Sequence, residues 1–215
     1  SGYYNQGLGY YACFQNRTGY YNVSLGYYNG PNTTNLDNTI ALGSGARTSA
    51  SNQARVGNAS ITSIGGPVAW TNTSDARFKT DIRRDEVVGL DFIMKLKPAT
   101  YRFDVHKMYE FEGMLNDTMT WKSQFDKEKY RYTGFIAQEV ESAAREVGFD
   151  FSGVDKPKND KDYYGLRYAE FVVPIVKAIQ EQQSEIEILK EQIELLKASN
   201  ELLKEQNNLL KNQTK

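Results

Sequence analysis

The sequence predicts a mixed fold in three parts: an N-terminal β-solenoid over residues 1–66, a small α+β domain over 67–171, and a C-terminal α-helical coiled coil over 172–215. Three observations lead to this prediction. A repeated Gly-Tyr-Tyr phrase fills the first part, helix-like and strand-like apolar spacings alternate in the second, and an unbroken heptad pattern fills the third.

The composition excludes several classes of function. The formal net charge of −1, with acidic and basic residues interleaved, leaves no basic face for nucleic acid or a membrane surface. Cys13 is the only cysteine, which excludes an internal disulfide and a cysteine-rich zinc site. We therefore expect no cofactor, metal, nucleic-acid or membrane partner, and we interpret His106, the only histidine, as an exposed surface residue.

The first part is built from a 17-residue repeat. Gly-Tyr-Tyr occurs at 2–4, 9–11, 19–21 and 26–28, and a weaker continuation follows from residue 38. Each repeat can form one or two short strands, with Gly and Asn in the turns, but it can bury a core only against neighbouring repeats or other chains. This predicts a β-solenoid with the tyrosines in its core. Because the chain begins inside a repeat, we expect it to be the C-terminal piece of a longer protein.

The second part mixes the two periodicities. Val87–Leu96 and Ala137–Val147 have apolar residues at helical spacing, and the second of these predicted helices ends at Gly148. Strands are predicted at 100–105, 132–136 and 163–168. Residues 104–129 are interpreted as a polar and aromatic arm, and 156–162 as a charged loop. This mixture predicts an α+β domain.

The third part predicts a left-handed supercoil, because its 4-3 apolar spacing never slips over about six heptads. Positions a and d hold nine apolar residues (Val172, Ile175, Ile179, Ile186, Leu189, Ile193, Leu196, Leu203, Leu210) and three polar ones (Gln182, Asn200, Asn207). Position c is also apolar (Ile188, Leu195, Leu202, Leu209), so we expect this stripe to contact a third helix or another part of the fold. Ile at a with Leu at d favours dimers, so the core alone does not predict a trimer.

Between the first two parts lies a polar junction that includes Ser74, Asp75, Arg77 and Lys79. A serine followed by an aspartate is by itself an ordinary turn or cap. Four blocks in order change this interpretation: Ser74-Asp75-x-Arg77-x-Lys79-x-x-Ile82, Leu96-Lys97-Pro98-Ala99-Thr100-Tyr101, Gly134-Phe135-Ile136-Ala137-Gln138-Glu139-Val140, and Tyr168-x-x-Phe171-Val172-Val173-Pro174 leading into the coiled coil.

These blocks, over about residues 70–185, resemble the endosialidase-type C-terminal intramolecular chaperones that end phage tail spikes and fibres. Phrases at 38–43 and 54–58 also resemble the heads of trimeric autotransporter adhesins and trimeric phage β-helices. The resemblance implies a homotrimer that folds the upstream fibre domain in cis and then severs itself. It also implies a Ser74–Lys79 pair, an autocatalytic serine endopeptidase activity, and a place in a phage tail fibre, assembled in the cytoplasm, or at a bacterial surface.

The chemistry of this pair follows from elementary rules. With no histidine available, a buried lysine can lose its proton and accept that of Ser74 Oγ. An extended chain would place residues 74 and 79 on opposite faces, roughly 16 Å apart, and a helix would place them about 140° apart. The chain must therefore bend between them, or Lys79 must come from a neighbouring chain.

The bond that is cut stays open between two positions. The resemblance implies the Ser74–Asp75 bond, but a serine attacking its own carbonyl would form a strained four-membered ring. Attack on the Thr73 carbonyl forms a five-membered ring and leaves an ester. We expect the Ser74–Asp75 cut, made by a serine from another chain or by an activated water. Gln138 and Glu139 are predicted either to support this site or to form an exposed first helical turn. The competing hypothesis is a structural trimerisation module, in an adhesin or tail fibre, that never cleaves.

Overall fold

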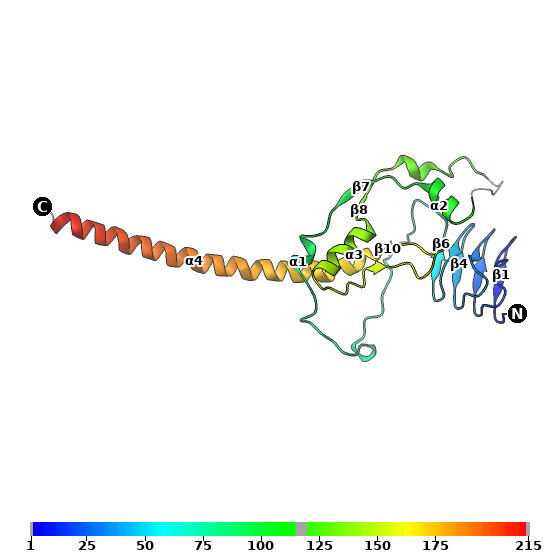
Figure 1. Cartoon of the computed structure of the whole chain (residues 1–215), viewed down its shortest axis with the longest axis horizontal. Helices are drawn as coiled ribbons and strands as arrows, with labels where there is room; N and C mark the ends of the chain where they lie inside the picture. The colour runs from blue at the N-terminus through cyan, green and yellow to red at the C-terminus, as the bar shows by residue number, and fades with distance from the viewer. Residues whose placement is uncertain (1, 115–119, 214–215) are drawn as a thin grey trace. The chain divides into compact units, whose positions relative to one another are not determined.

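The computed structural model describes residues 2–114 and 120–213, and the chain divides into two compact units. The first unit comprises residues 1–80, 97–138 and 154–166, and the second comprises 81–96, 139–153 and 167–215. The fold is mixed α/β with a long C-terminal helix, as the sequence predicts (Figure 1). The predicted domain boundaries after residues 66 and 171 stay predictions.

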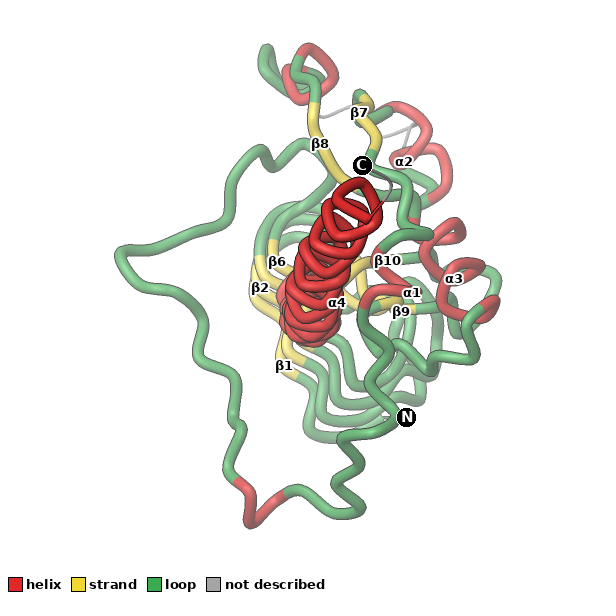
Figure 2. The backbone as a smooth tube through the Cα atoms, turned by 90° about the vertical axis from the view of Figure 1, so that its left-hand side faces the viewer, coloured by secondary structure: helices red, strands yellow, loops and turns green. Residues whose placement is uncertain are grey.

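The repeats of the first unit form a stack of short parallel strands (Figures 1 and 2). The sheet has the order β1-β2-β4-β6, with β1 at Gln6–Leu8, β2 at Val23–Leu25, β4 at Ile40–Leu42 and β6 at Ala54–Val56. Paired residues lie 17 positions apart from β1 to β2 and from β2 to β4, but 14 apart from β4 to β6. A second parallel pair, β3 (Gly30–Pro31) with β5 (Arg47–Thr48), also has the 17-residue spacing. The repeat length in the sequence is therefore the distance along the chain between stacked rungs.

The interior of this stack is polar. Asn22 is fully buried, and its amide group donates a hydrogen bond of 2.9 Å to Asn5 Oδ1. Its own Oδ1 accepts hydrogen bonds from the backbone N–H and the hydroxyl of Thr39, at 3.0 and 2.6 Å. Because Asn5, Asn22 and Thr39 are equivalent positions of successive rungs, one ladder of side-chain hydrogen bonds satisfies the buried groups and fixes the register.

The tyrosines do not form the core of the single chain, which corrects the sequence-based expectation. The side chains of Tyr4 and Tyr10 are 74% and 66% exposed. They stack instead on the equivalent ring of the next rung, with centroids 5.2 Å apart for Tyr4 and Tyr21 and 5.8 Å for Tyr10 and Tyr27. The second tyrosine of each phrase has a positive φ, 60° at Tyr4 and 58° at Tyr21, so its side chain leaves the turn outward. The spacing of the tyrosines thus shows the length of the repeat, and small side chains and side-chain amides fill the interior of the stack.

Later segments complete the first unit. β7 (Ala99–Tyr101) pairs antiparallel with β8 (Tyr132–Gly134), and β9 (Val154–Asp155) pairs antiparallel with β10 (Gly165–Leu166). The predicted arm at 104–129 contains α2 (Val105–Phe111) and the short 3-10 helix η2 (Asp126–Lys129), which the polar composition concealed. Val105 and Tyr109 of α2 form a small buried cluster with Ala59 of the repeat region.

The second unit has an aromatic core. Phe92 of α1 (Leu90–Ile93) is fully buried against Phe149 and Phe151, and Phe151 in turn meets Phe171 of η3 (Tyr168–Phe171) at 4.8 Å. Burying a phenylalanine of this kind contributes about 1.5–3 kcal/mol. The predicted helix at 87–96 is a single turn, because it begins only after Gly89. The helix predicted at 137–147 is confirmed as α3 (Ala137–Glu146), and Gly148 follows it with φ at 67°.

The C-terminal helix α4 runs without interruption over 42 residues, Val172–Gln213. Its a and d side chains are exposed in the single chain, for example Ile179 at 58% and Leu196 at 65%. The apolar c positions for which a contact was predicted (Ile188, Leu195, Leu202, Leu209) are exposed in the single chain. Nearer the start of α4, Pro174 is buried, and this part of the chain packs against α1. Within the part of the chain that the structure describes, no helix is both long and apolar enough to cross a membrane.

Candidate functional site

The junction around Ser74 is held by a short turn of 3-10 helix, η1 (Ala76–Phe78), in the connection that follows the repeats. Asp75 caps this turn, because its Oδ1 accepts a hydrogen bond of 2.8 Å from the backbone N–H of Arg77. The backbone N–H groups of Phe78 and Lys79 donate to the carbonyl oxygens of Asp75 and Ala76, both at 3.1 Å. Together these hydrogen bonds fold the five residues 75–79 into a tight turn.

This turn brings the two predicted site residues together within one chain. Nζ of Lys79 donates a hydrogen bond of 2.7 Å to Oγ of Ser74. The sequence required either a bend or a second chain, and the structure contains the bend. A neutral amine at the same distance would accept the proton of the hydroxyl instead, so the geometry fits a nucleophile beside its base.

The pair is open to water. Ser74 and Lys79 are exposed, and so are large apolar side chains near them in the sequence: Val68 at 81%, Trp70 at 85% and Phe78 at 74%. Within the described residues, no hydrogen-bond donor meets the carbonyl oxygen of Thr73 or Ser74. The single chain therefore has the serine–lysine contact, but within the described residues this contact has neither a dry site nor donors for an oxygen that would become negative during acyl transfer.

Arg77 is a site residue that sequence reasoning did not assign. Its guanidinium forms a two-pronged ion pair with Asp75, at 3.0 Å from Nε and 2.7 Å from Nη2 to Oδ2. The hydrogen bonds of Arg77 lower the pKa of the Asp75 carboxyl group, so Asp75 stays ionised and fixed next to the junction. The sequence feature that could have indicated this ion pair is the Asp-x-Arg spacing, which brings the arginine next to the aspartate that caps the turn.

The two predicted supporting residues lie in the first turn of α3. Gln138 and Glu139 are its second and third residues, and both are exposed. This is the position where a glutamate complements the positive end of the helix dipole. Their support of the cleavage site stays a prediction.

The only histidine is exposed, as the sequence predicts, and takes part in a local cluster. Potential ligand atoms of Asp104, His106 and Glu128 lie within 4.8 Å of one another. Oε1 of Glu128 already accepts from the backbone N–H of Val105 and of His106, at 2.9 and 3.1 Å, and it lies 2.8 Å from Nδ1 of His106. Asp104 Oδ1 accepts from the N–H of Lys107 at 2.9 Å. The cluster is thus explained as the cap of α2.

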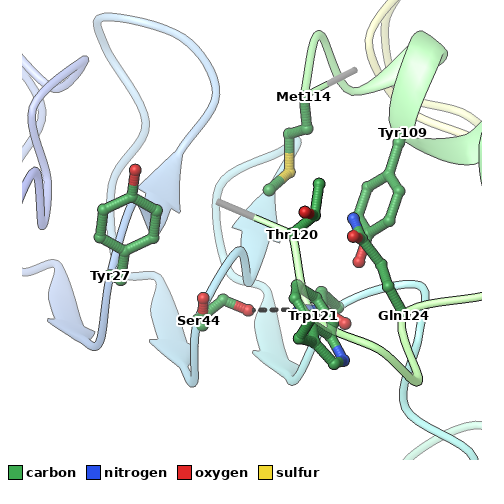
Figure 3. A pocket seen from close by; sticks show the side chains of 8 residues that line it. Tyr27, Ser44, Tyr109, Met114, Thr120, Trp121 and Gln124 are labelled. Carbon is green, nitrogen blue, oxygen red and sulfur yellow. Dashed lines mark hydrogen bonds between the residues drawn. The ribbon is translucent and has the colours of Figure 1, made fainter. Parts of the chain in front are cut away.

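A pocket of about 300 Å³ lies elsewhere in the first unit (Figure 3). Tyr27, Tyr109, Met114 and Trp121 provide its apolar walls, and Gln124 and Ser44 add polar groups. Neither Ser74 nor Lys79 lines it. Among the described residues, the Ser74–Lys79 pair thus lies on an exposed turn and outside this pocket.

Comparison with known protein families finds a match over the middle of the chain. The model of a peptidase family described as "Chaperone of endosialidase" matches residues 74–149. The matched segment begins at Ser74 and includes Lys79, Gln138 and Glu139. No curated protein and no solved structure matches the chain significantly.

Proposed function

The chain belongs, through residues 74–149, to the family of endosialidase chaperones, and we propose that it trimerises and folds the repeat region and any fibre domain before it, then severs itself at the Ser74–Asp75 junction. The family match supports the chaperone role, and the peptidase name of the family supports self-cleavage. One observation carries the proposal: the 2.7 Å contact between Lys79 Nζ and Ser74 Oγ stands at the first residue of the matched segment.

In the proposed reaction, neutral Lys79 takes the proton of a Ser74 hydroxyl as its oxygen attacks a carbonyl carbon. Attack on the Thr73 carbonyl within the same chain passes through a five-membered ring, transfers the acyl group to Oγ and frees the amine of Ser74. Hydrolysis of this ester then leaves Ser74 at the start of the C-terminal fragment. A cut between Ser74 and Asp75 needs the serine of another copy, or a water that Lys79 deprotonates, and leaves Asp75 at the start. We favour the second outcome on family resemblance.

Assembly supplies what the single chain lacks. A lysine acts as a base only where its surroundings favour the neutral amine, and burial away from water has that effect. The exposed Trp70 and Phe78 beside the pair are the apolar surface that a neighbouring copy would cover. Under this proposal the pair is inactive in a monomer and becomes active on assembly, so cleavage reports that the fibre has formed.

The surfaces of both units support association into a homotrimer. The sheet of the repeats carries apolar side chains at one equivalent position of its four rungs: Leu8, Leu25 and Val56 are 73%, 41% and 47% exposed, and Leu42, between the last two, is half-buried. Three copies of such a row, meeting around an axis, would complete a β-solenoid stalk. The a and d positions of α4 would meet as a coiled coil. The surroundings that fit this assembly are a phage tail fibre or a bacterial surface adhesin.

A second function is favoured by the exposure of the Ser74–Lys79 pair. If assembly leaves this turn in water, the pair does not react and the chain serves as a permanent trimerisation module of a fibre or adhesin. The two functions share the trimer and differ only at the junction.

Mass spectrometry of the intact purified chain separates them. Cleavage after Ser74 gives fragments of 74 and 141 residues, and the structural module gives only the 215-residue chain. Ser74→Ala and Lys79→Ala should each yield an intact chain that still forms trimers in light scattering, whereas Ser63→Ala, an exposed serine in the same connection, should cleave like the parent. Normal cleavage in both Ser74→Ala and Lys79→Ala would rule out the pair.

A further inference from the structure

The proposed cut does not fall between separately folded parts. Residues 97–138 and 154–166 follow Ser74 in the chain, yet they form one compact unit with the repeats at 1–80. The segments that would act as chaperone therefore contact the repeats, which would be the client that they fold. The residues that form these contacts can be named one by one.

One of these contacts is made by the charged loop 156–162, through a buried carboxylate. Asp162 is only 7% exposed, and its Oδ1 accepts a hydrogen bond of 2.6 Å from the hydroxyl of Ser49, 113 positions earlier. The amide of Asn159 in the same loop donates to the carbonyl oxygen of Ser49 at 2.7 Å. A buried carboxylate is retained only where hydrogen bonds replace its water. The loop thus holds both the side chain and the backbone of one repeat residue.

The same loop also contacts the preceding rung at the equivalent position. Asn32 lies 17 residues before Ser49, which is one repeat. Its amide donates to the carbonyl oxygen of Lys161 at 3.3 Å, and Lys161 Nζ donates to the carbonyl oxygen of Asn32 at 3.4 Å. The equivalent residues of two successive rungs, Asn32 and Ser49, therefore both form hydrogen bonds with the loop, Asn32 with Lys161 and Ser49 with Asp162.

These contacts lie where the repeat length changes. The rung between β4 and β6 has 14 residues instead of 17, and Ser49 stands in its turn, directly after β5. Inside this turn, Gln53 Oε1 accepts from the N–H groups of Ser49 and Ala50, at 3.0 and 3.1 Å. Ser49, which is 2% exposed, and Gln53, which is 8% exposed, thus meet the Asp162 loop at the shortened last rung.

A second, apolar contact lies next to the last rung. Tyr109 of α2 is 3% exposed, packs with Val105 against Ala59, and has its hydroxyl 2.7 Å from Oγ of Ser60. Ala59 and Ser60 lie three and four residues after the end of β6. The helix α2 therefore packs next to the end of the repeats, and loop 156–162 contacts the last turn.

We propose that loop 156–162 is the surface by which the chaperone recognises its client: it docks on two successive rungs at Asn32 and Ser49, with Asp162 as the anchor, and sets the register of the last rung. The proposal rests on the chaperone function proposed above and names the surface through which that function acts. A correctly paired last rung then serves as the template on which the earlier rungs stack, since each rung needs a neighbour in register. Asp162 is a positioning residue and takes no part in cleavage.

The test uses the full chain with Asp162→Ala, and Asp160→Ala as its matched control, because Asp160 is an exposed acid of the same loop. Refolding from denaturant is followed by protease resistance of residues 1–66 and, separately, by the circular dichroism of the helices. We expect Asp162→Ala to lower the yield of protease-resistant repeats about tenfold, because it removes a hydrogen bond to a buried charge, with helix content unchanged. Asp160→Ala should behave like the parent.

A double-mutant cycle with Ser49→Ala identifies the contact. If Asp162 acts through Ser49, then Ser49→Ala should lower the yield of the parent chain strongly. The same Ser49→Ala change made in the Asp162→Ala chain should lower the yield much less. Asp162→Asn, which keeps the shape and one acceptor oxygen, should fall between the parent and Asp162→Ala. Equal repeat yields for Asp162→Ala and Asp160→Ala would overturn the proposal, as would fully additive effects in the cycle.

Making the same variants in a Ser74→Ala chain separates this proposal from the previous one. Uncleaved Ser74→Ala chains with normal repeats, in which Asp162→Ala has no effect, would leave the cleavage function standing and reject the anchor. An Asp162→Ala defect in a chain that cleaves despite Ser74→Ala would support the anchor and reject the Ser74–Lys79 pair.

Discussion

The carboxylate of Glu181 accepts a hydrogen bond of 2.6 Å from the backbone N–H of Leu90, 91 positions earlier in the chain. The bond ties the first turn of α1 to the side of α4, and the close approach is possible because Gly89 precedes it: a Cβ there would lie 2.7 Å from the backbone N of Ala178. Position c of the heptad (Pro174, Glu181) and position g (Ala178) therefore face the chain's own fold. The a and d positions, such as Ile175 and Ile179, remain exposed. Intrachain packing and the proposed association use different faces of α4.

Glu181→Ala should destabilise the second unit by about 1–2 kcal/mol. It leaves the N–H of Leu90 without its charged acceptor, and a hydrogen bond to an ionised group contributes about this much. Urea unfolding followed by circular dichroism measures the change. Glu185→Ala, at an exposed position one turn further along α4, is the control and should change the free energy of unfolding by less than about 0.5 kcal/mol. Equal stability of the two variants would show that the contact with Leu90 contributes nothing.

Ile193→Asp should abolish trimers at micromolar concentration. Ile193 occupies an a position and is 50% exposed in the single chain, and a carboxylate placed in a dry seam costs several kcal/mol in each copy. Light scattering coupled to gel filtration gives the mass. The control is Ala198→Asp, on the f position of the outer face, which should leave the mass of the assembly unchanged. If Ile193→Asp assembles like the parent, α4 does not associate through its a and d positions.

The packing of α2 should weaken as the pH rises from 5 to 8. Burial raises the pKa of Glu112 to about 7, although the attraction of Arg47 and Arg55 opposes the shift. A carboxyl group whose folded-state pKa is raised gives its full stabilisation below its ordinary pKa and loses it as the pH rises through about 7. Hydrogen exchange of the α2 amides should therefore speed up over this range, after correction for the intrinsic pH dependence.

Glu112→Gln is the matching variant for this effect. It keeps the shape of the side chain but cannot ionise, so the corrected exchange rate of α2 should change less between pH 5 and 8 than it does in the parent. Asp75 and Asp162 do not interfere, because their pKa values are lowered and their contributions are lost only as the pH falls towards acid. An unchanged pH dependence in Glu112→Gln would assign the effect to another group.

Cleavage should leave the two fragments together. The Asp162–Ser49 and Tyr109–Ser60 contacts join residues on opposite sides of the proposed cut, and they do not depend on the covalent bond between Ser74 and Asp75. We expect both fragments to co-elute in gel filtration of the cleaved parent and to separate more readily in Asp162→Ala. Sequencing the C-terminal fragment from its first residue should give Asp75. Finding Ser74 there would instead indicate attack on the Thr73 carbonyl.

Local pattern determined a large part of this protein. A 17-residue repeat can stack only with a 17-residue register, so the pairing of Gln6 with Val23 follows from the sequence. The heptads of 172–213 and the apolar spacing of 137–147 predict helices because these periods match the α-helix. The four ordered blocks indicate the family, because the order of motifs can be read from the sequence without knowing the fold. The Ser74–Lys79 pair was likewise named from its motif.

Tertiary structure decided the rest. The sequence could not choose between a bend and a second chain for Ser74 and Lys79, because the choice depends on the three hydrogen bonds of the η1 turn. The sequence predicts the tyrosines inside the stack. The hydrogen bonds between Asn22 and Thr39, which allow polar side chains to fill the interior instead, form only between stacked rungs. The sequence predicts only a charged loop at 156–162, and the contact over 113 positions shows that Asp162 is buried against Ser49. Periodic and local features are set by neighbours along the chain, whereas burial and long-range hydrogen bonds exist only once distant segments have met.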